Sequence, residues 1–217
     1  MKIFVVVASL FLSLNVIGQK SYYFSDPVPS AEKRIDNVNA KLFGEYTSPD
    51  GRIYSFEETG IYVISTSISS MSRTSIRESA QYNVINGYIH GVLKDDSIPC
   101  VLDGERYYFG VRNRDLLIGE GSNNVLTESA NNSNEYFINM KEDGVYVPIR
   151  LTFQKKGLDI SYFDYEFETE IFDGVENQKV IKNEFNDLVI LSPTSDEFYQ
   201  MAMEELFPKS VPLKRAK

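Results

Sequence analysis

The segment Val84-Ile85-Asn86-Gly87-Tyr88-Ile89 places an Asn-Gly pair between two short runs of β-prone residues. Asn and Gly accept the positive φ that a two-residue hairpin turn requires, so this segment predicts two antiparallel strands joined by a tight turn. Connections this short leave no room for crossover helices, which disfavours a parallel α/β sheet. Similar turn pairs recur between residues 43 and 191: Asp50-Gly51, Asp103-Gly104, Asp143-Gly144, Lys156-Gly157 and Asp173-Gly174. The sequence therefore predicts a mainly β fold, an antiparallel meander arranged as a barrel or as a two-part β sandwich.

Short helices are expected at both ends of this β region. Residues 31–42 suit a helix capped by Ser30, because apolar residues recur there at helical spacing. A second helix is expected over residues 195–207, where Thr194 and Glu197 have capping-box spacing and Pro208 ends the helix. Two polar stretches, Ser65–Ser79 and Glu120–Asn134, are expected to be loops.

These features divide the chain into consecutive segments. They are a signal peptide (1–18), a lead-in with a short helix (19–42), a first β meander (43–121), a polar loop (122–134), a second meander with the C-terminal helix (135–207), and a basic tail (208–217) expected to be disordered and solvated. A faint internal repeat matches residues 56–63 with 140–147, and residues 113–118 with 185–190. Either the two halves are similar hairpin series, or the β-prone composition produces the match by coincidence.

The N-terminus has the features of a secretory signal. Lys2 precedes an apolar run from Ile3 to Leu14, and the small residue Gly18 stands before the polar Gln19. This run is shorter than the roughly 20 apolar residues that a membrane anchor needs. Its form resembles signals of Bacteroidetes-type bacteria. We expect cleavage after Gly18 and an exported protein that is periplasmic, at the cell surface or secreted, with no transmembrane segment after cleavage.

Charge and cysteine content exclude several classes of partner. Without residues 1–18 the chain has 21 basic and 31 acidic residues, a net charge of −10. Such a surface repels phosphate backbones, which makes nucleic acid an unsuitable partner. The sole cysteine, Cys100, cannot form an internal disulfide and lies far from the cleavage point, so it is not an N-terminal lipid attachment site.

His90 and Cys100 are each the only residue of their type. A thiolate–imidazole pair could act as a nucleophile and base, but no family motif surrounds either residue. Cys100, between Pro99 and Val101, is typical of a small buried hydrophobe. One His and one Cys cannot supply a zinc site of the usual kind. The sequence thus predicts no catalytic residues, no metal site and no cofactor.

Acidic and aromatic clusters are candidate binding sites. In residues 158–172, apolar residues alternate with Asp164, Glu166, Glu168 and Glu170, which predicts a half-buried strand. Carboxylates about 6.6–7 Å apart along one strand are too widely spaced to surround a calcium ion, and choosing two of them as a glycosidase pair would be arbitrary. A solvated face, or pairing with neighbouring Lys and Arg, is the simpler reading. The aromatic clusters Tyr22-Tyr23 and Tyr107-Tyr108 suit sugar stacking or cross-strand core packing, and Asp96-Ser97-Ile98 resembles a short O-glycosylation signal of Bacteroidetes-type exported proteins.

The stretch Leu42-Phe43-Gly44-Glu45-Tyr46 after a short helix resembles the opening of lipocalin-like barrels, where a Gly-x-Trp begins the first strand. Tyr46 stands where Trp is usual. The closing helix fits the same order of elements. About a dozen strand candidates, against the eight of a lipocalin, also suit two small meanders or a sandwich. The resemblance implies a barrel scaffold but identifies no binding residues.

Three functional hypotheses follow. The first is a non-catalytic exported protein that binds a small apolar ligand or an envelope component. The second is a structural or adhesion-type module that binds protein or glycan on sheet edges or faces. The third is a hydrolase. An apolar cavity of about 300 Å³ or more would favour the ligand-binding protein. A filled interior with an exposed aromatic patch would favour the interaction module. A cleft joining His90 to Cys100 or to two carboxylates would favour the hydrolase.

Overall fold

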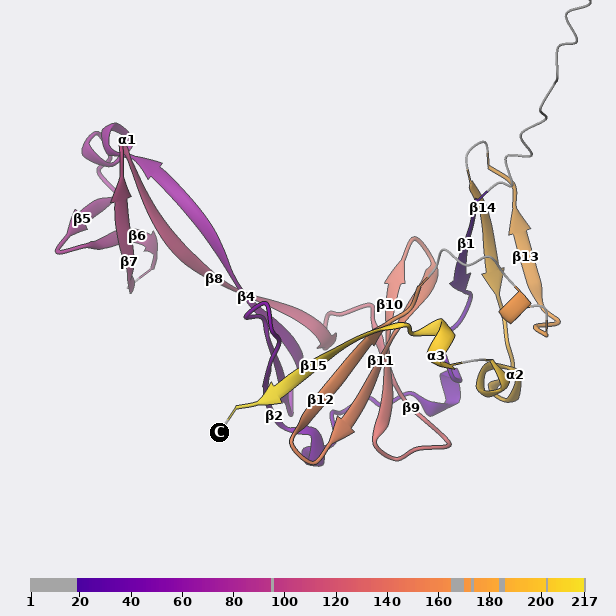
Figure 1. Cartoon of the computed structure of the whole chain (residues 1–217). Coiled ribbons are helices and arrows are strands. Elements are labelled where there is room, and N and C mark those ends of the chain that lie inside the picture. The colour runs from indigo at the N-terminus through magenta and orange to yellow at the C-terminus, as the bar shows by residue number, and fades with distance from the viewer. Residues whose placement is uncertain are drawn as a thin grey trace, which may run out of the picture.

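The computed structural model describes residues 19–94, 96–164, 170–172, 174–183, 186–201 and 203–216. Within these ranges fifteen strands form one large, mostly antiparallel sheet (Figure 1). The strands are β1 (Gln19–Phe24), β2 (Gly44–Thr47), β3 (Ile53–Glu57), β4 (Gly60–Ser72), β5 (Asn83–Ile85), β6 (Tyr88–Leu93), β7 (Asp96–Asp103), β8 (Arg106–Gly119), β9 (Val125–Glu128), β10 (Glu135–Glu142), β11 (Val145–Gln154), β12 (Gly157–Tyr162), β13 (Gln178–Ile181), β14 (Asn186–Leu191) and β15 (Lys209–Arg215). The helices are α1 (Arg73–Arg77), α2 (Ser195–Gln200) and α3 (Met203–Leu206), with 3-10 turns η1 (Ala31–Lys33), η2 (Ala40–Leu42) and η3 (Glu170–Phe172).

The predicted hairpins are confirmed at five of the six turn pairs. Asn86-Gly87 has φ values of 52° and 81°, and Asp143-Gly144 has 46° and 88°, as a tight hairpin turn requires. These pairs join β5 to β6 and β10 to β11. Three others join β2 to β3, β7 to β8 and β11 to β12. The sixth pair includes residue 173, which lies outside the described residues.

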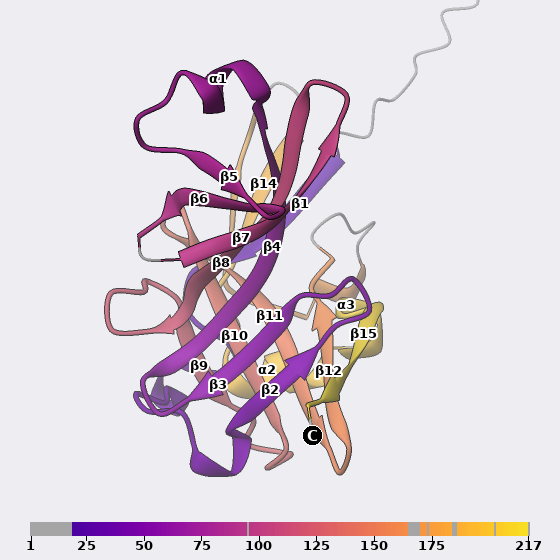
Figure 2. The same cartoon turned by 90° about the vertical axis from the view of Figure 1, so that its left-hand side faces the viewer.

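Nine strands curl around the main core of the molecule. Their order is β9-β10-β11-β12-β15-β2-β3-β4-β8, and Figure 2 shows β2, β3 and β4 side by side. The core takes Leu126 from one end of the order and Ile118 from the other, so the two ends approach each other. The chain after η1 lies along β9, where the Ile35 N–H donates to the Leu126 carbonyl at 2.8 Å.

A second layer packs on the outer side of β10 and β11. β1 pairs with β14 in parallel, and β14 pairs on its other side with β13 in antiparallel orientation. The helices α2 and α3 complete this layer. Its core is rich in phenylalanine, including Phe24, Phe137 and Phe198. The parallel β1–β14 pair is absent from the predicted meander, because it joins strands from opposite ends of the chain.

Three segments differ from the sequence expectations. Residues 65–79 are not a loop: β4 continues to Ser72 in register with β8, and α1 follows. The expected helix at 31–42 is two single 3-10 turns, although Ser30 does cap the first. The basic tail contains strand β15, inserted between β12 and β2, because Leu213 is buried in the main core while Lys209 and Lys214 remain exposed.

Two further segments differ in part from the sequence expectations. The loop expected at 120–134 contains strand β9, which pairs with β10. The C-terminal helix is in two parts, because Met201 has extended backbone angles after α2. The capping box is confirmed: the Glu197 N–H donates to the Thr194 hydroxyl and the Thr194 N–H to the Glu197 carboxylate. That carboxylate also accepts the Glu176 N–H, and these bonds, the one from Glu176 foremost, lower the pKa of Glu197.

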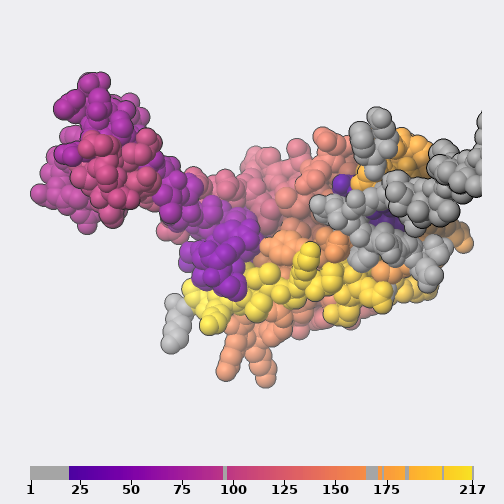
Figure 3. All heavy atoms as spheres, turned by 45° about the horizontal axis from the view of Figure 1, so that its top comes forward, coloured from indigo at the N-terminus to yellow at the C-terminus, as the bar shows by residue number. Residues whose placement is uncertain are grey.

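A two-stranded ribbon projects from the body of the molecule (Figure 1). β4 and β8 pair from Gly60–Gly119 to Ser72–Arg106, and their distal halves carry β5, β6, β7 and α1. We call residues 65–112 the tip and the other described residues the body. The tip has its own small core, and the space-filling view shows it joined to the body through a narrow neck (Figure 3). In the part of the chain that the structure describes, none of the helices combines the length and apolar character that a bilayer crossing requires.

Candidate functional site

The structure does not bring His90 and Cys100 together. On β6 and β7 the residue opposite His90 is Ser97, whereas Cys100 lies opposite Phe109 of β8. Side chains alternate along a strand, so His90 points to one side of the tip sheet and Cys100 to the other. Burial raises the pKa of the Cys100 thiol, which favours its protonated form. The arrangement therefore gives no thiolate–imidazole pair.

The other predicted candidates are scattered. The single strand expected over residues 158–172 is wrong: β12 ends at Tyr162, before Asp164, and Glu170 begins the 3-10 turn η3. Glu166 and Glu168 lie outside the described residues. Among the described residues no group of three or more His, Cys, Asp or Glu side chains is placed to hold a metal ion. Tyr22 is buried and stacks on Phe172 in the second core. Tyr107 packs against the tip core, while Tyr108 is exposed.

Aromatic rings pack against one another in the main core of the body. Tyr46 and Phe56 lie 5.4 Å apart between ring centroids, and Phe153 lies 5.4–5.7 Å from both and from Tyr136. Their edge-to-face geometry is the favourable arrangement for packed rings. Tyr46, which the lipocalin resemblance singles out, is thus part of a packed interior.

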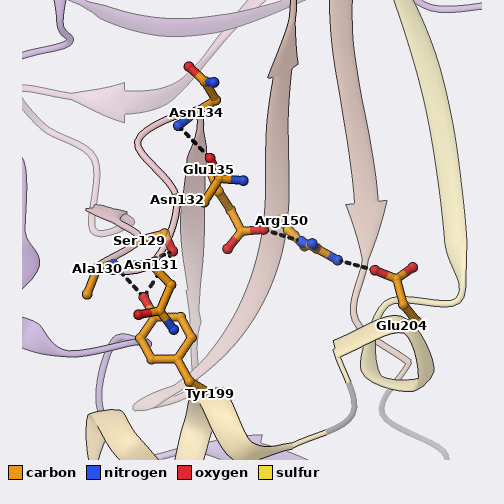
Figure 4. Close-up of polar contacts among 9 residues, drawn as sticks. All are labelled: Ser129, Ala130, Asn131, Asn132, Asn134, Glu135, Arg150, Tyr199 and Glu204. Carbon is orange, nitrogen blue, oxygen red and sulfur yellow. Dashed lines mark hydrogen bonds and ion pairs between the residues drawn. The ribbon is translucent and has the colours of Figure 1, made fainter.

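A polar cluster ties the helices of the second layer to the sheet (Figure 4). Arg150 of β11 pairs with Glu135 of β10 at 2.7 Å and with Glu204 of α3 at 3.1 Å. The Tyr199 hydroxyl of α2 accepts the Ala130 N–H at 2.7 Å. The Glu135 side chain is only 8% exposed, so its charge needs this partner. We assign the cluster a structural role, because its ion pairs and hydrogen bonds join its members to one another.

The tip presents a bare apolar surface on one side of its sheet. Ile85, Tyr88 and Pro99 are successive cross-strand neighbours on β5, β6 and β7. Next to them Val101 lies opposite Tyr108, and Ile68 of β4 lies opposite Gly110. Directly opposite residues share a side of an antiparallel sheet, as do residues two apart along a strand. We call this set of exposed side chains the tip face: Ile68 (81% exposed), Val101 (70%), Ile85 (51%), Tyr88 (45%), Tyr108 (38%) and Pro99.

The opposite side of the tip sheet is packed near α1, although Leu102 on that side is 44% exposed. Ile76 of α1 packs there with Ile89, Ile98 and Phe109, and these four are the buried side chains of the tip core among the described residues. Tyr82, in the chain between α1 and β5, packs against the same core. The tip is thus a sheet with one packed side, whereas none of the described residues covers the apolar tip face.

Polar residues border the tip face on two sides. Asn83, His90 and Ser97 form the next cross-strand row at one border. Asp103 and Arg106 lie opposite each other at the other border, where the Arg106 guanidinium donates to the Ser70 hydroxyl. An apolar centre with a polar rim is typical of protein–protein interfaces. A groove of about 590 Å³, lined by residues that include His90, Gly91 and Lys94, adjoins the first border.

Sequence reasoning missed the tip face, although a signal for it exists. Val101-Leu102 and Tyr107-Tyr108-Phe109 are unbroken apolar or aromatic runs within strands, without the alternation of a half-exposed sheet. Such runs are typical of strands that are buried on both faces. Comparison with known protein families, curated proteins and solved structures gives no match to this chain. The tip face is therefore the strongest functional candidate that the geometry offers.

Proposed function

We propose that this protein is an exported, non-catalytic interaction module that binds another protein through the tip face. The observation that supports this most is the uncovered apolar surface led by Ile68 and Val101, held away from the body on the β4–β8 ribbon. A contiguous exposed apolar surface with a polar rim marks an interaction site more often than chance exposure does. The flat shape of a sheet face suits a protein surface better than a small molecule.

In this proposal the body is a lipocalin-like scaffold. β15 pairs with both β12 and β2, and so links the last hairpin of the series to the strand that begins at Gly44. The rings packed around Phe153 support a scaffold role, because they form part of the main core of the body. The candidate partner is an envelope protein, a class that includes a second copy of this exported chain.

Export is part of the same proposal. It is supported by the sequence of residues 1–18, where Lys2 precedes an apolar run to Leu14 and the small residue Gly18 stands before Gln19. A partner in the periplasm, at the cell surface or outside the cell would then meet the mature chain.

Site-specific photo-crosslinking in the cells that make the protein tests the proposed function. p-Benzoylphenylalanine placed at Val101 should give a defined protein adduct. The same probe at Val180, an exposed apolar residue of the body, should not give that adduct. Absence of any adduct at Val101, or the same adducts at both positions, would count against binding through the tip face.

A further inference from the structure

We propose that the occupant of the tip face is the tip face of a second copy of this chain, packed around a two-fold axis. This inference rests on the proposed function, since it names the partner of the same surface. It starts from the strands themselves: Tyr107 and Phe109 pack toward the tip core, while Tyr108 between them is exposed on the tip face. Strands that are apolar on both sides normally pack between two layers. One layer is present, and a second copy would supply the other.

Charge favours a second tip over other surfaces of the same protein. The tip has five basic and five acidic residues, whereas the rest of the chain from residue 19 has 16 basic and 26 acidic residues. The whole net charge of −10 therefore lies outside the tip, and two such acidic parts of the chain repel each other. The ribbon holds the neutral tip away from the body (Figure 3), so two tips can meet while the acidic bodies stay apart.

The tip face contains both the raised and the low features that a self-complementary contact needs. Ile68 is the most exposed apolar side chain of the set, and its cross-strand neighbour Gly110 has no side chain. Along β4 its same-side neighbours are the short Thr66 and Ser70. In a two-fold interface each copy uses the same surface, so a raised residue must meet a low place on that surface. Ile68 is the raised residue, and the surface around Gly110 is the low place.

The rim offers matching charges for the same arrangement. Asp103 and Arg106 lie opposite each other at one border of the tip face. A two-fold axis presents each member of such a pair to the opposite charge of the other copy when that border lies near the axis. Rim charges add more to the specificity of an interface than to its affinity.

The size of the surface sets the expected strength. Six exposed apolar side chains amount to a few hundred Å² per copy, which places the combined contact near or below the roughly 1,200 Å² lower bound of specific stable interfaces. The dimer should therefore be reversible, with a dissociation constant on the order of 10 µM rather than nanomolar.

Sedimentation velocity on the chain from Gln19 to Lys217 tests this directly. The wild type should shift from monomer to dimer over concentrations from about 1 to about 300 µM, a range that brackets the expected dissociation constant. Val101→Asp should stay monomeric, since it would place a carboxylate in the centre of the contact. Val180→Asp makes the same change at an exposed apolar residue of the body and should dimerise like the wild type. Because Val101 is 70% exposed, its replacement should leave the circular dichroism spectrum unchanged.

The outcomes separate this inference from the function on which it rests. A wild type that stays monomeric at the highest concentration overturns self-association, and so does a Val101→Asp variant that still dimerises. An adduct in cells between the Val101 probe and a different protein would then leave the interaction module standing with another partner. An adduct at twice the mass of the chain supports the two-fold contact. If the probe at Val101 gives no adduct of either kind, both proposals fail.

Discussion

Replacing Phe109 by alanine should loosen the tip while leaving the body folded. Phe109 is 4% exposed and is one of the four buried side chains of the tip core among the described residues. Burying about 200 Å² of aromatic surface at about 25 cal/mol per Å² is worth about 5 kcal/mol. Replacing a buried phenylalanine by alanine typically costs about 3–5 kcal/mol of stability, in agreement with this value.

This loss should stay local because the tip core and the main body core are separate clusters, linked through the β4–β8 ribbon. A core this small cannot absorb the loss of its ring by repacking. The free energy of opening the tip should therefore fall by about 3 kcal/mol or more, which raises the open population more than a hundredfold.

Hydrogen–deuterium exchange with mass spectrometry would measure the effect. In Phe109→Ala, peptides from β5, β6 and β7 should exchange more than a hundredfold faster, while peptides from β10 to β12 keep the wild-type rate. The matched control is Phe56→Ala, which removes a buried ring from the main core and should accelerate exchange in the body. Equal acceleration of tip and body in Phe109→Ala would refute the reasoning, because it would mean that the two cores unfold as one unit.

Three further predictions concern the second layer and its helices. Arg150→Met should cost about 3–5 kcal/mol of unfolding free energy, because it leaves the buried Glu135 carboxylate unpaired; the double variant with Glu135→Leu should recover most of this loss in urea denaturation. Thr194→Ala removes a helix N-cap and should cost about 1 kcal/mol in the same assay, and no measurable loss would contradict the capping role. Backbone hydrogen bonds from Glu176 and Thr194 lower the pKa of Glu197 in the folded protein. The stability that these bonds give is therefore present above the unfolded pKa of Glu197, about 4.3, and is lost as the pH falls through the lower folded value. Thermal melts of Glu197→Gln at a series of acidic pH values should accordingly show a weaker loss of stability than the wild type, and parallel curves would contradict this.

These predictions bear on the proposed function through the ribbon. Because the tip folds on its own core, a substitution that destabilises the body should leave the tip face intact. A substitution that destabilises the tip should likewise leave the body folded. The Phe109→Ala variant should therefore lose tip-dependent association together with tip protection, whereas Arg150→Met should keep both at temperatures where the body remains folded.

Local features of the sequence determined the hairpins and the caps. The turn at Asn86-Gly87 and the capping box at Thr194 were predictable because their physical causes, positive φ and unpaired helix N–H groups, act within four or five residues. The same reasoning gave the mainly β fold and its antiparallel character, since each tight turn pairs the two strands next to it.

Only the tertiary structure decided which distant strands pair and which faces remain bare. β1 pairs with β14, and β15 enters the sheet between β12 and β2, although both β1 and β15 lie near the ends of the chain. The Ser-rich half of β4 is a strand because β8 supplies its hydrogen bonds, and so Ile68 lies on an exposed sheet face instead of in a loop. Strand pairing depends on partners far apart in sequence, whose backbone groups are alike, so no local pattern states which partner each strand will find.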